Sequence, residues 1–217
     1  MFHQIALVTM ARPEGIAFFR SARISVVRCS LTPMGGRRMQ ATETLFEIRR
    51  LGYRHLPSYR DIRQEAVMEC PEEFGIAAEQ EFARSDQWYL NRLSTSLVLG
   101  GFDHGGWLSG AVALDLRQTT AGNEVAVLSG MYLRTHARRS GRSRQLLQAA
   151  IFHAFERSPT IVLAVTFSNR RARLLYVAAG FREWKAGPPE AGGDISAGEV
   201  LMRLDQEDHS STNGFCP

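Results

Sequence analysis

Long apolar runs and paired cysteines are both missing from this chain of 217 residues. No stretch of about 18 apolar residues occurs, so the sequence predicts no helix that spans a membrane. The three cysteines, Cys29, Cys70 and Cys216, are widely spaced and form no CxxC pair. The sequence therefore predicts neither a disulfide framework nor a zinc or other metal site, and a reducing cytoplasm is the simplest compartment.

Acidic residues are nearly absent from the first 40 residues, which hold six arginines and a single acid, Glu14. This segment therefore carries a charge of +5, and the rest of the chain carries −1, because the whole chain sums to +4. An arginine-rich, acid-poor start is typical of a transit peptide, and it also fits a disordered accessory extension or sequence upstream of the true start. The basic balance of the chain thus gives no indication of nucleic-acid binding by the remainder.

Hydrophobic periodicity after residue 40 predicts one domain over residues 41–205, followed by a polar, fraying tail over 206–217. Alternating or β-branched apolar runs predict strands at 45–51, 94–101, 107–116, 124–134, 160–166, 181–185 and 199–204. Helical spacing predicts helices at about 57–68, 72–93, 142–157 and 169–179. Ser129-Gly130 inside the fourth strand predicts a β-bulge. This order predicts an α/β (α+β) fold in which helices flank a mixed sheet.

Two segments about 30 residues apart carry the chemistry. The first, Arg138–Ser143, reads Arg-Arg-Ser-Gly-Arg-Ser between an apolar strand and an apolar helix. A glycine-containing turn at a helix start exposes backbone N–H groups and favours an anion. The second, Asn169–Tyr176, ends in a tyrosine, which is a weak acid, and is followed by Gly180-Phe181. Together they indicate a phosphate-bearing acyl donor and a proton transfer, which is the outline of an N-acyltransferase.

Both motifs resemble those of the GNAT superfamily of N-acetyltransferases, and the resemblance extends over about residues 45–205. The family's loop pattern, Gln/Arg-x-x-Gly-x-Gly/Ala, is matched at Arg138 and Gly141, with Ser143 at the last position. The family's second pattern, Asn-x-x-Ala-x-x-x-Tyr followed by Gly-Phe, is matched at Asn169, Ala172, Tyr176, Gly180 and Phe181. The resemblance implies a mixed, mostly antiparallel sheet that splays between its fourth and fifth strands.

The activity that the resemblance implies is transfer of an acetyl group from acetyl-CoA, as co-substrate and without a metal, to a primary amine. The amine of a small molecule or a peptide would attack the thioester directly in a ternary complex, and the enzyme would be a monomer or a homodimer. Tyr176 is the implied acid that protonates the departing thiolate. The implied acetyl-CoA-binding residues are Met131, Tyr132, Leu133, Arg138, Arg139, Ser140, Gly141, Arg142, Ser143, Arg144 and Asn169.

The loop departs from the usual residues of the family at Arg139, Arg142 and Gln145. A catalytically weak, GNAT-like module that binds acyl-CoA or a protein partner is therefore the alternative function. Nucleic-acid binding by the same arginines is disfavoured, because no aromatic interleaving or groove-reading motif accompanies them.

Individual residues also have more than one interpretation. Tyr176 fits a packing tyrosine on an amphipathic helix as well as an acid, and Asn169 fits a helix N-cap as well as a ligand of the pantetheine arm. The general base stays unassigned, because Glu124 and His136 are both weak candidates. The acceptor amine is not encoded in either motif.

Overall fold

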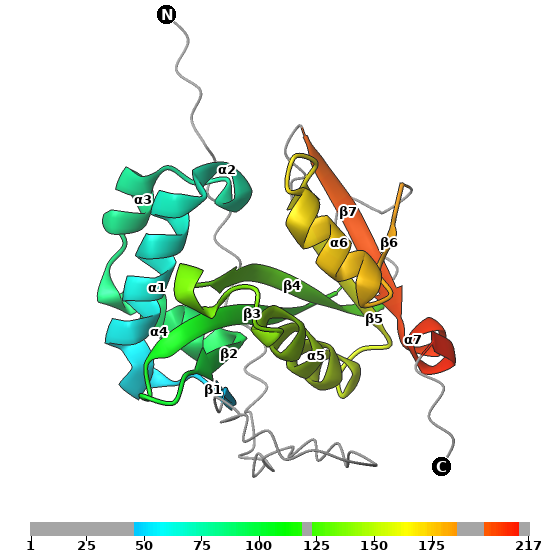
Figure 1. Ribbon diagram of the computed structural model, residues 1–217, viewed down its shortest axis with the longest axis horizontal. Coiled ribbons are helices and arrows are strands. Elements are labelled where there is room, and N and C mark those ends of the chain that lie inside the picture. Colours follow the sequence, from blue (N-terminus) through cyan, green and yellow to red (C-terminus); the bar gives the residue numbers. More distant parts are fainter. Residues whose placement is uncertain (1–45, 119–122, 186–197, 213–217) are drawn as a thin grey trace, which may run out of the picture. The chain divides into compact units, whose positions relative to one another are not determined.

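The computed structural model describes residues 46–118, 123–185 and 198–212, and the basic extension expected over residues 1–40 lies outside them. Figure 1 shows the elements of the described residues. The strands are β1 (Glu47–Arg50), β2 (Leu97–Phe102), β3 (Leu108–Gln118), β4 (Glu124–Leu133), β5 (Thr160–Thr166), β6 (Arg182–Glu183) and β7 (Glu199–Asp205). The helices are α1 (Leu56–Glu69), α2 (Pro71–Phe74), α3 (Ala78–Phe82), α4 (Asp86–Thr95), α5 (Arg142–Phe155), α6 (Arg170–Ala178) and α7 (Gln206–Thr212). Two 3-10 helices, η1 (Tyr53–His55) and η2 (Thr135–Ala137), precede α1 and α5. Within this described part, none of the helices has the length and apolar character that a membrane span needs.

The strands form one seven-stranded sheet in the order β1-β2-β3-β4-β5-β7-β6. Neighbouring strands are antiparallel except for β4 and β5, which are parallel. A parallel pair needs a crossover connection, and here α5 supplies it. The predicted fold class, a mixed and mostly antiparallel sheet flanked by helices, is confirmed.

The parallel pair of β4 and β5 separates soon after it begins. Its register comprises only Ala126 with Ile161 and Val127 with Val162, although both strands continue well beyond these residues. The backbone of the second half of β4 therefore has no strand partner on its β5 side. The predicted splay between the fourth and fifth strands is confirmed.

A β-bulge bends β4 at the point where it leaves β5. Ala111 pairs with Tyr132 and Ala113 with Ser129, so that Gly130 and Met131 together oppose a single residue of β3. The φ angle of Gly130 is +59°, in the left-handed region that glycine adopts without strain. The bulge predicted from Ser129-Gly130 is confirmed.

Each face of the sheet is covered by its own layer of helices (Figure 1). Helices α1 and α4 pack on one face through an apolar cluster that includes Ile62, Tyr89, Val98 and Ala113. Helices α5 and α6 pack on the other face through a cluster that includes Leu99, Val112, Leu146 and Tyr176. Neighbours in one strand belong to opposite clusters because successive strand side chains point to opposite faces.

The segment before β2 differs from the single helical region predicted over 72–93. It forms three short helices, α2, α3 and α4, because two local signals interrupt the helical pattern. Gly75 ends α2 in a left-handed conformation with φ of +61°, and Ser85 begins α4 by accepting a hydrogen bond from the Trp88 backbone N–H at 3.3 Å.

The polar segment after β7 also differs from the frayed tail that the sequence predicts. Residues 206–212 form α7, whose first N–H donates to the Pro159 carbonyl at 3.0 Å. Asp208 lies 3.3 Å from the guanidinium of Arg182, and the His209 ring lies 5.6 Å from that of Phe155. These tertiary contacts hold a helix that its polar sequence alone does not indicate.

Candidate functional site

A run of free backbone donors precedes and opens α5. The Arg138 N–H donates to the Thr135 carbonyl, and the first bond of α5 runs from the Gln145 N–H to the Gly141 carbonyl at 3.1 Å. Between them, the six consecutive N–H groups of Arg139–Arg144 donate to no atom of the residues that the structure describes. A helix start with unpaired N–H groups and the positive end of the helix dipole is a site for an anion.

The backbone of this turn keeps the donors open. Arg139 and Gly141 have φ angles of +62° and +78°, so left-handed residues alternate with ordinary ones, as in anion-binding nests. The Ser140 hydroxyl donates to the Ala137 carbonyl at 2.8 Å and ties the turn to η2. A Cβ built on Gly141 meets no atom within 4 Å, so a side chain there would enter the open space at the turn and not the protein interior.

Three arginines of the turn add positive charge. Arg139, Arg142 and Arg144 make no ion pair with any carboxylate among the residues the structure covers, and Arg139 and Arg144 are exposed. The Arg142 guanidinium lies 5.3 Å from the ring centroid of Phe46. Unpaired guanidinium groups beside unpaired N–H groups suit a ligand with several phosphate oxygens.

The fourth arginine of the turn, Arg138, has different neighbours. Its Nε donates to the Leu133 carbonyl at 2.8 Å, and its Nη2 donates to Glu69 of α1 at 2.6 Å. Its guanidinium also lies 5.2 Å from the ring centroid of Tyr132. The sequence-predicted residue Arg138 is therefore directed toward α1.

Two predicted ligands, Met131 and Leu133, lie at the end of β4 that has left β5. The Arg134 N–H donates to the Ser109 carbonyl of β3, so by alternation along the strand the backbone groups of Leu133 point to the side of the splay, while Met131 belongs to the bulge. Tyr132, between them, pairs with β3, and its buried hydroxyl donates to Glu65 of α1 at 3.0 Å. Burial and the neighbouring carboxylates raise the pKa of Tyr132.

Tyr176 reaches across the splay from α6 to β4. Its side chain is buried, and its ring lies 5.8 Å from that of Phe181. Within the described ranges, the hydroxyl has one hydrogen-bond partner, the Met131 sulfur at 3.9 Å, which is a weak acceptor. Burial raises the pKa of Tyr176 to about 12, so the hydroxyl keeps its proton at neutral pH.

Asn169 begins α6 as its N-cap. Its Oδ1 accepts from the Ala172 N–H at 3.1 Å, and its own N–H donates to the Thr166 carbonyl at 3.0 Å. Its side-chain amide nitrogen donates to none of the described residues, so it is available to a ligand at the end of β5.

A polar network beneath the bulge was not anticipated from the sequence. Arg92 of α4 donates to the Ser129 hydroxyl at 2.8 Å and pairs with Asp115. Arg63 of α1 pairs with the fully buried carboxylate of Glu81 at 3.2 Å. A Cβ on residue 130 would lie 3.1 Å from the Arg63 guanidinium, so this network packs directly against the bulge. The sequence feature that could have indicated this network is Arg63, a charged residue on the apolar face of α1.

The two weak candidates for a base lie elsewhere. Glu124 is at the first residue of β4, and the strand's nine further residues span about 30 Å to the splayed end. The Nε2 of His136 lies 3.1 Å from the Ser109 hydroxyl, on the β2–β3 side of η2. Neither is brought to Tyr176 or Met131, and no group of three potential metal ligands occurs among the residues described.

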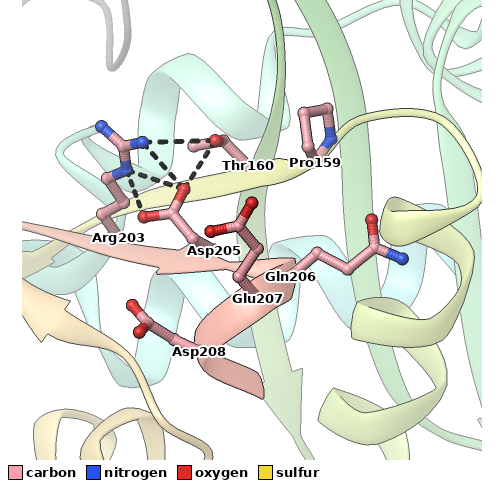
Figure 2. Close-up of a pocket in the computed structure, with 7 residues that line it drawn as sticks. All are labelled: Pro159, Thr160, Arg203, Asp205, Gln206, Glu207 and Asp208. Carbon is pink, nitrogen blue, oxygen red and sulfur yellow. Dashed lines mark hydrogen bonds and ion pairs between the residues drawn. The ribbon is translucent and has the colours of Figure 1, made fainter. Parts of the chain in front are cut away.

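Two cavities lie outside the turn itself. The larger, about 570 Å³, is at the start of β5 and the end of β7 (Figure 2), the opposite end of β5 from the splay. There the guanidinium of Arg203 is already held by Asp205 at 2.8 Å and lies against Thr160. The second cavity, of about 440 Å³, is lined by Asp61, Gln64, Glu65, Met68, Glu69 and Phe82. Because Glu65 also accepts from Tyr132, this second cavity adjoins the end of β4.

Comparison with known protein families decides the family. A model of the acetyltransferase (GNAT) family matches residues 59–181, which is more than half of the chain and includes both motifs. The chain belongs to the GNAT family of acetyltransferases. A search of the curated proteins found no match.

Solved structures share the GNAT fold. A GNAT-family acetyltransferase from Streptococcus pneumoniae is 18% identical, with a TM-score of 0.60, over 74% of this chain and 99% of that one. The PaiA N-acetyltransferase from Thermoplasma acidophilum, solved with coenzyme A, is 18% identical, with a TM-score of 0.57, over 74% and 99% of the two chains. YncA from Salmonella typhimurium, solved with acetyl-CoA, is 19% identical, with a TM-score of 0.57, over 80% and 98%. At these identities the likeness shows the fold alone.

In this GNAT chain the two motifs meet at one end of β4. The turn of free N–H groups follows the strand after the short helix η2, and Tyr176 contacts Met131 within the strand. The structure thus brings together a turn of free N–H groups, an open strand edge and a buried tyrosine hydroxyl.

Proposed function

We propose that this GNAT protein transfers an acetyl group from acetyl-CoA to a primary amine. The observation that carries the proposal is the run of six unpaired N–H groups, Arg139–Arg144, beside the splayed end of β4. A pyrophosphate fits such a cradle, because its oxygens accept several hydrogen bonds and gain from the helix dipole. The open space at Gly141 leaves room for that approach.

Different residues of the chain would bind different parts of acetyl-CoA. The N–H groups of the turn would hold the pyrophosphate, with Ser140 shaping the turn and Ser143 in its helical part. Arg139, Arg142 and Arg144 would neutralise phosphate charge. The backbone of Met131 and Leu133 would bind the pantetheine arm along the open edge of β4, with the amide nitrogen of Asn169 on the opposite side of the splay.

The proposed chemistry is direct attack of a neutral amine on the thioester carbonyl in a ternary complex. A bond from nitrogen to the acetyl carbon forms, the carbon–sulfur bond breaks, and the departing thiolate receives the proton of the Tyr176 hydroxyl. The nitrogen releases one proton to solvent as it becomes an amide, and the Tyr176 phenolate takes one proton back from solvent. A covalent acetyl-cysteine is not part of the proposal. Among described residues Cys70 is the only free cysteine, and burial raises the pKa of its thiol, which makes it a poor nucleophile.

A binding module without catalysis is the second candidate function. It is favoured by Arg139, which adopts a left-handed φ of +62° at a position where glycine would be free of strain. A turn that carries such strain and three unpaired arginines is compatible with binding acyl-CoA for a purpose other than turnover.

Two measurements on the full chain separate these functions. Titration calorimetry with acetyl-CoA measures binding, and release of free thiol over a panel of amino acids, peptides and polyamines measures transfer. Binding with thiol release supports the enzyme, binding without release across the panel supports the module, and no binding overturns both. Protein incubated with labelled acetyl-CoA alone and then acid-quenched should retain no acetyl label, since retained label would contradict direct attack.

A further inference from the structure

The guanidinium of Arg138 connects the coenzyme turn to helix α1. Its Nε donates to the Leu133 carbonyl, the last residue of β4, at 2.8 Å. Its Nη2 donates to Oε2 of Glu69, the last residue of α1, at 2.6 Å. The planar guanidinium thus donates hydrogen bonds to the end of β4 and to the end of α1 at the same time.

The carboxylate of Glu69 holds both ends of η2. Its Oε2 accepts from Arg138, which follows η2, and its Oε1 accepts from the hydroxyl of Thr135, which begins η2, at 3.2 Å. The hydrogen bond from Arg138 lowers the pKa of Glu69, so the carboxylate is ionised at neutral pH. The short helix that leads into the turn is therefore fixed to α1 at two points.

A second carboxylate, one helical turn earlier on α1, repeats this arrangement. Glu65 accepts from the Tyr132 hydroxyl at 3.0 Å and lies 3.1 Å from Nε of Arg134. Residues four apart share one face of a helix. The same face of α1 therefore binds the last part of β4 and the residues at both ends of η2.

We propose that Glu69 and Arg138 are positioning residues for acetyl-CoA. The pair holds the end of β4 and the turn so that the free N–H groups of Arg139–Arg144 face the ligand, and Arg138 itself makes no bond to phosphate. This inference rests on the proposed function. Glu65 and Glu69 also line the 440 Å³ cavity of α1 and α3, so an occupant of that cavity would touch the same carboxylates that fix the turn.

If Arg138 instead bound phosphate, the loss of the Glu69 charge would change coenzyme affinity in the opposite direction. If Arg138 were a phosphate ligand restrained by Glu69, removal of the Glu69 charge would release it and strengthen coenzyme binding. If the pair positions the turn, the same change weakens coenzyme binding. The sign of the effect of Glu69→Gln therefore decides between the two roles.

The experiment is calorimetric titration of the full chain with coenzyme A, with Glu69→Gln compared to wild type. We expect the Kd to rise about fivefold, because the pair is partly exposed and its strength is screened accordingly. The matched control is Glu72→Gln, which removes an exposed acid on α2 that makes no ion pair with the described residues, and its Kd should equal that of wild type. Where thiol release is measurable, the KM for acetyl-CoA should rise while kcat at saturation changes little.

A second variant tests the geometry of the fork. Arg138→Lys retains the charge, but its flexible ammonium lacks the rigid planar fork whose Nε and Nη2 donate to the Leu133 carbonyl and to Glu69, so its Kd should rise as in Glu69→Gln. S-acetylpantetheine, which lacks phosphates, should also bind more weakly to Arg138→Lys, because the disturbed strand end binds the arm.

The outcomes separate this inference from the proposed function. Tighter binding of coenzyme A by Glu69→Gln, or unchanged binding by Arg138→Lys, overturns the positioning role and leaves the proposed function in place. Failure of the wild type to bind either coenzyme A or acetyl-CoA overturns both.

Discussion

Replacement of Tyr176 by phenylalanine removes one hydroxyl and little else. The ring would keep its packing against Phe181, 5.8 Å away, within the main apolar cluster. In the described part of the chain, the lost hydroxyl has one hydrogen-bond partner, the Met131 sulfur at 3.9 Å. A hydroxyl so weakly bonded contributes little to folding, so we expect the free energy of unfolding to change by less than about 1 kcal/mol.

The same change should affect turnover strongly. Loss of a general acid typically costs a factor of roughly 10² to 10⁴ in rate, and we expect kcat to fall by at least about 100-fold. The affinity for acetyl-CoA should stay within about twofold of wild type, because the cradle and the β4 edge remain intact. Thiol release measures kcat, calorimetry measures affinity, and urea denaturation measures stability.

Tyr89→Phe is the matched control for this experiment. Burial also raises the pKa of Tyr89 to about 12, but its hydroxyl donates to the buried carboxylate of Glu81 at 3.1 Å. Its removal should lower the free energy of unfolding by about 2 kcal/mol and leave kcat close to wild type. An unchanged kcat in Tyr176→Phe would remove Tyr176 as the acid, and a large loss of stability there would show that its hydroxyl is a structural group.

Three further predictions follow from the same turn and tyrosine. Gly141→Val should weaken acetyl-CoA binding at least tenfold in calorimetry, while Gly106→Ala, with a similar φ of +75° and equally open space, should leave it unchanged and so control for strain. Arg139→Gly should raise the free energy of unfolding by about 1 kcal/mol in urea, because its φ of +62° disfavours a side chain, and an equal gain in Arg139→Ala would instead implicate charge. Burial raises the pKa of Tyr176 to about 12, so its hydroxyl stays protonated to higher pH than that of an exposed tyrosine. We therefore expect kcat/KM to rise with pH as the amine deprotonates, and to show no fall caused by Tyr176 below about pH 11. A fall in kcat/KM near pH 10 that is absent in Tyr176→Phe would contradict the raised pKa of Tyr176.

Much of the architecture could be predicted because its signals are local. Glycine inside an apolar strand predicted the bulge at Gly130, and the structure confirms it with a φ of +59°. Alternating apolar residues located β3, β4 and β5, since a strand with one or two buried faces requires that pattern. The failure over 72–93 was also local, because Gly75 and Ser85 are helix-ending and helix-starting residues whose effect outweighed the longer helical pattern.

The candidate site could be located from the sequence but not oriented. The positions of Gly141 and Tyr176 followed from motif spacing. Two further facts depend on tertiary packing. Arg138 points to Glu69 because α1 lies beside the end of β4, and the Tyr176 hydroxyl on α6 meets, among the described residues, only the Met131 sulfur of β4. Helix α7 also depends on tertiary contacts. Its polar sequence indicates no helix, and contacts with Arg182 and Phe155 hold it in place.

The sequence by itself determined the order of the elements and the places where the backbone departs from them, because periodicity, glycine and proline act on their immediate neighbours. Only the tertiary structure decided which arginines of the turn are free. Arg138 meets a carboxylate 69 residues earlier in the chain, whereas Arg139, Arg142 and Arg144 meet none in the described residues. Whether an arginine is paired or left free for a ligand depends on the carboxylates near it, and carboxylates so distant in sequence are placed by the packing of the helices on the sheet.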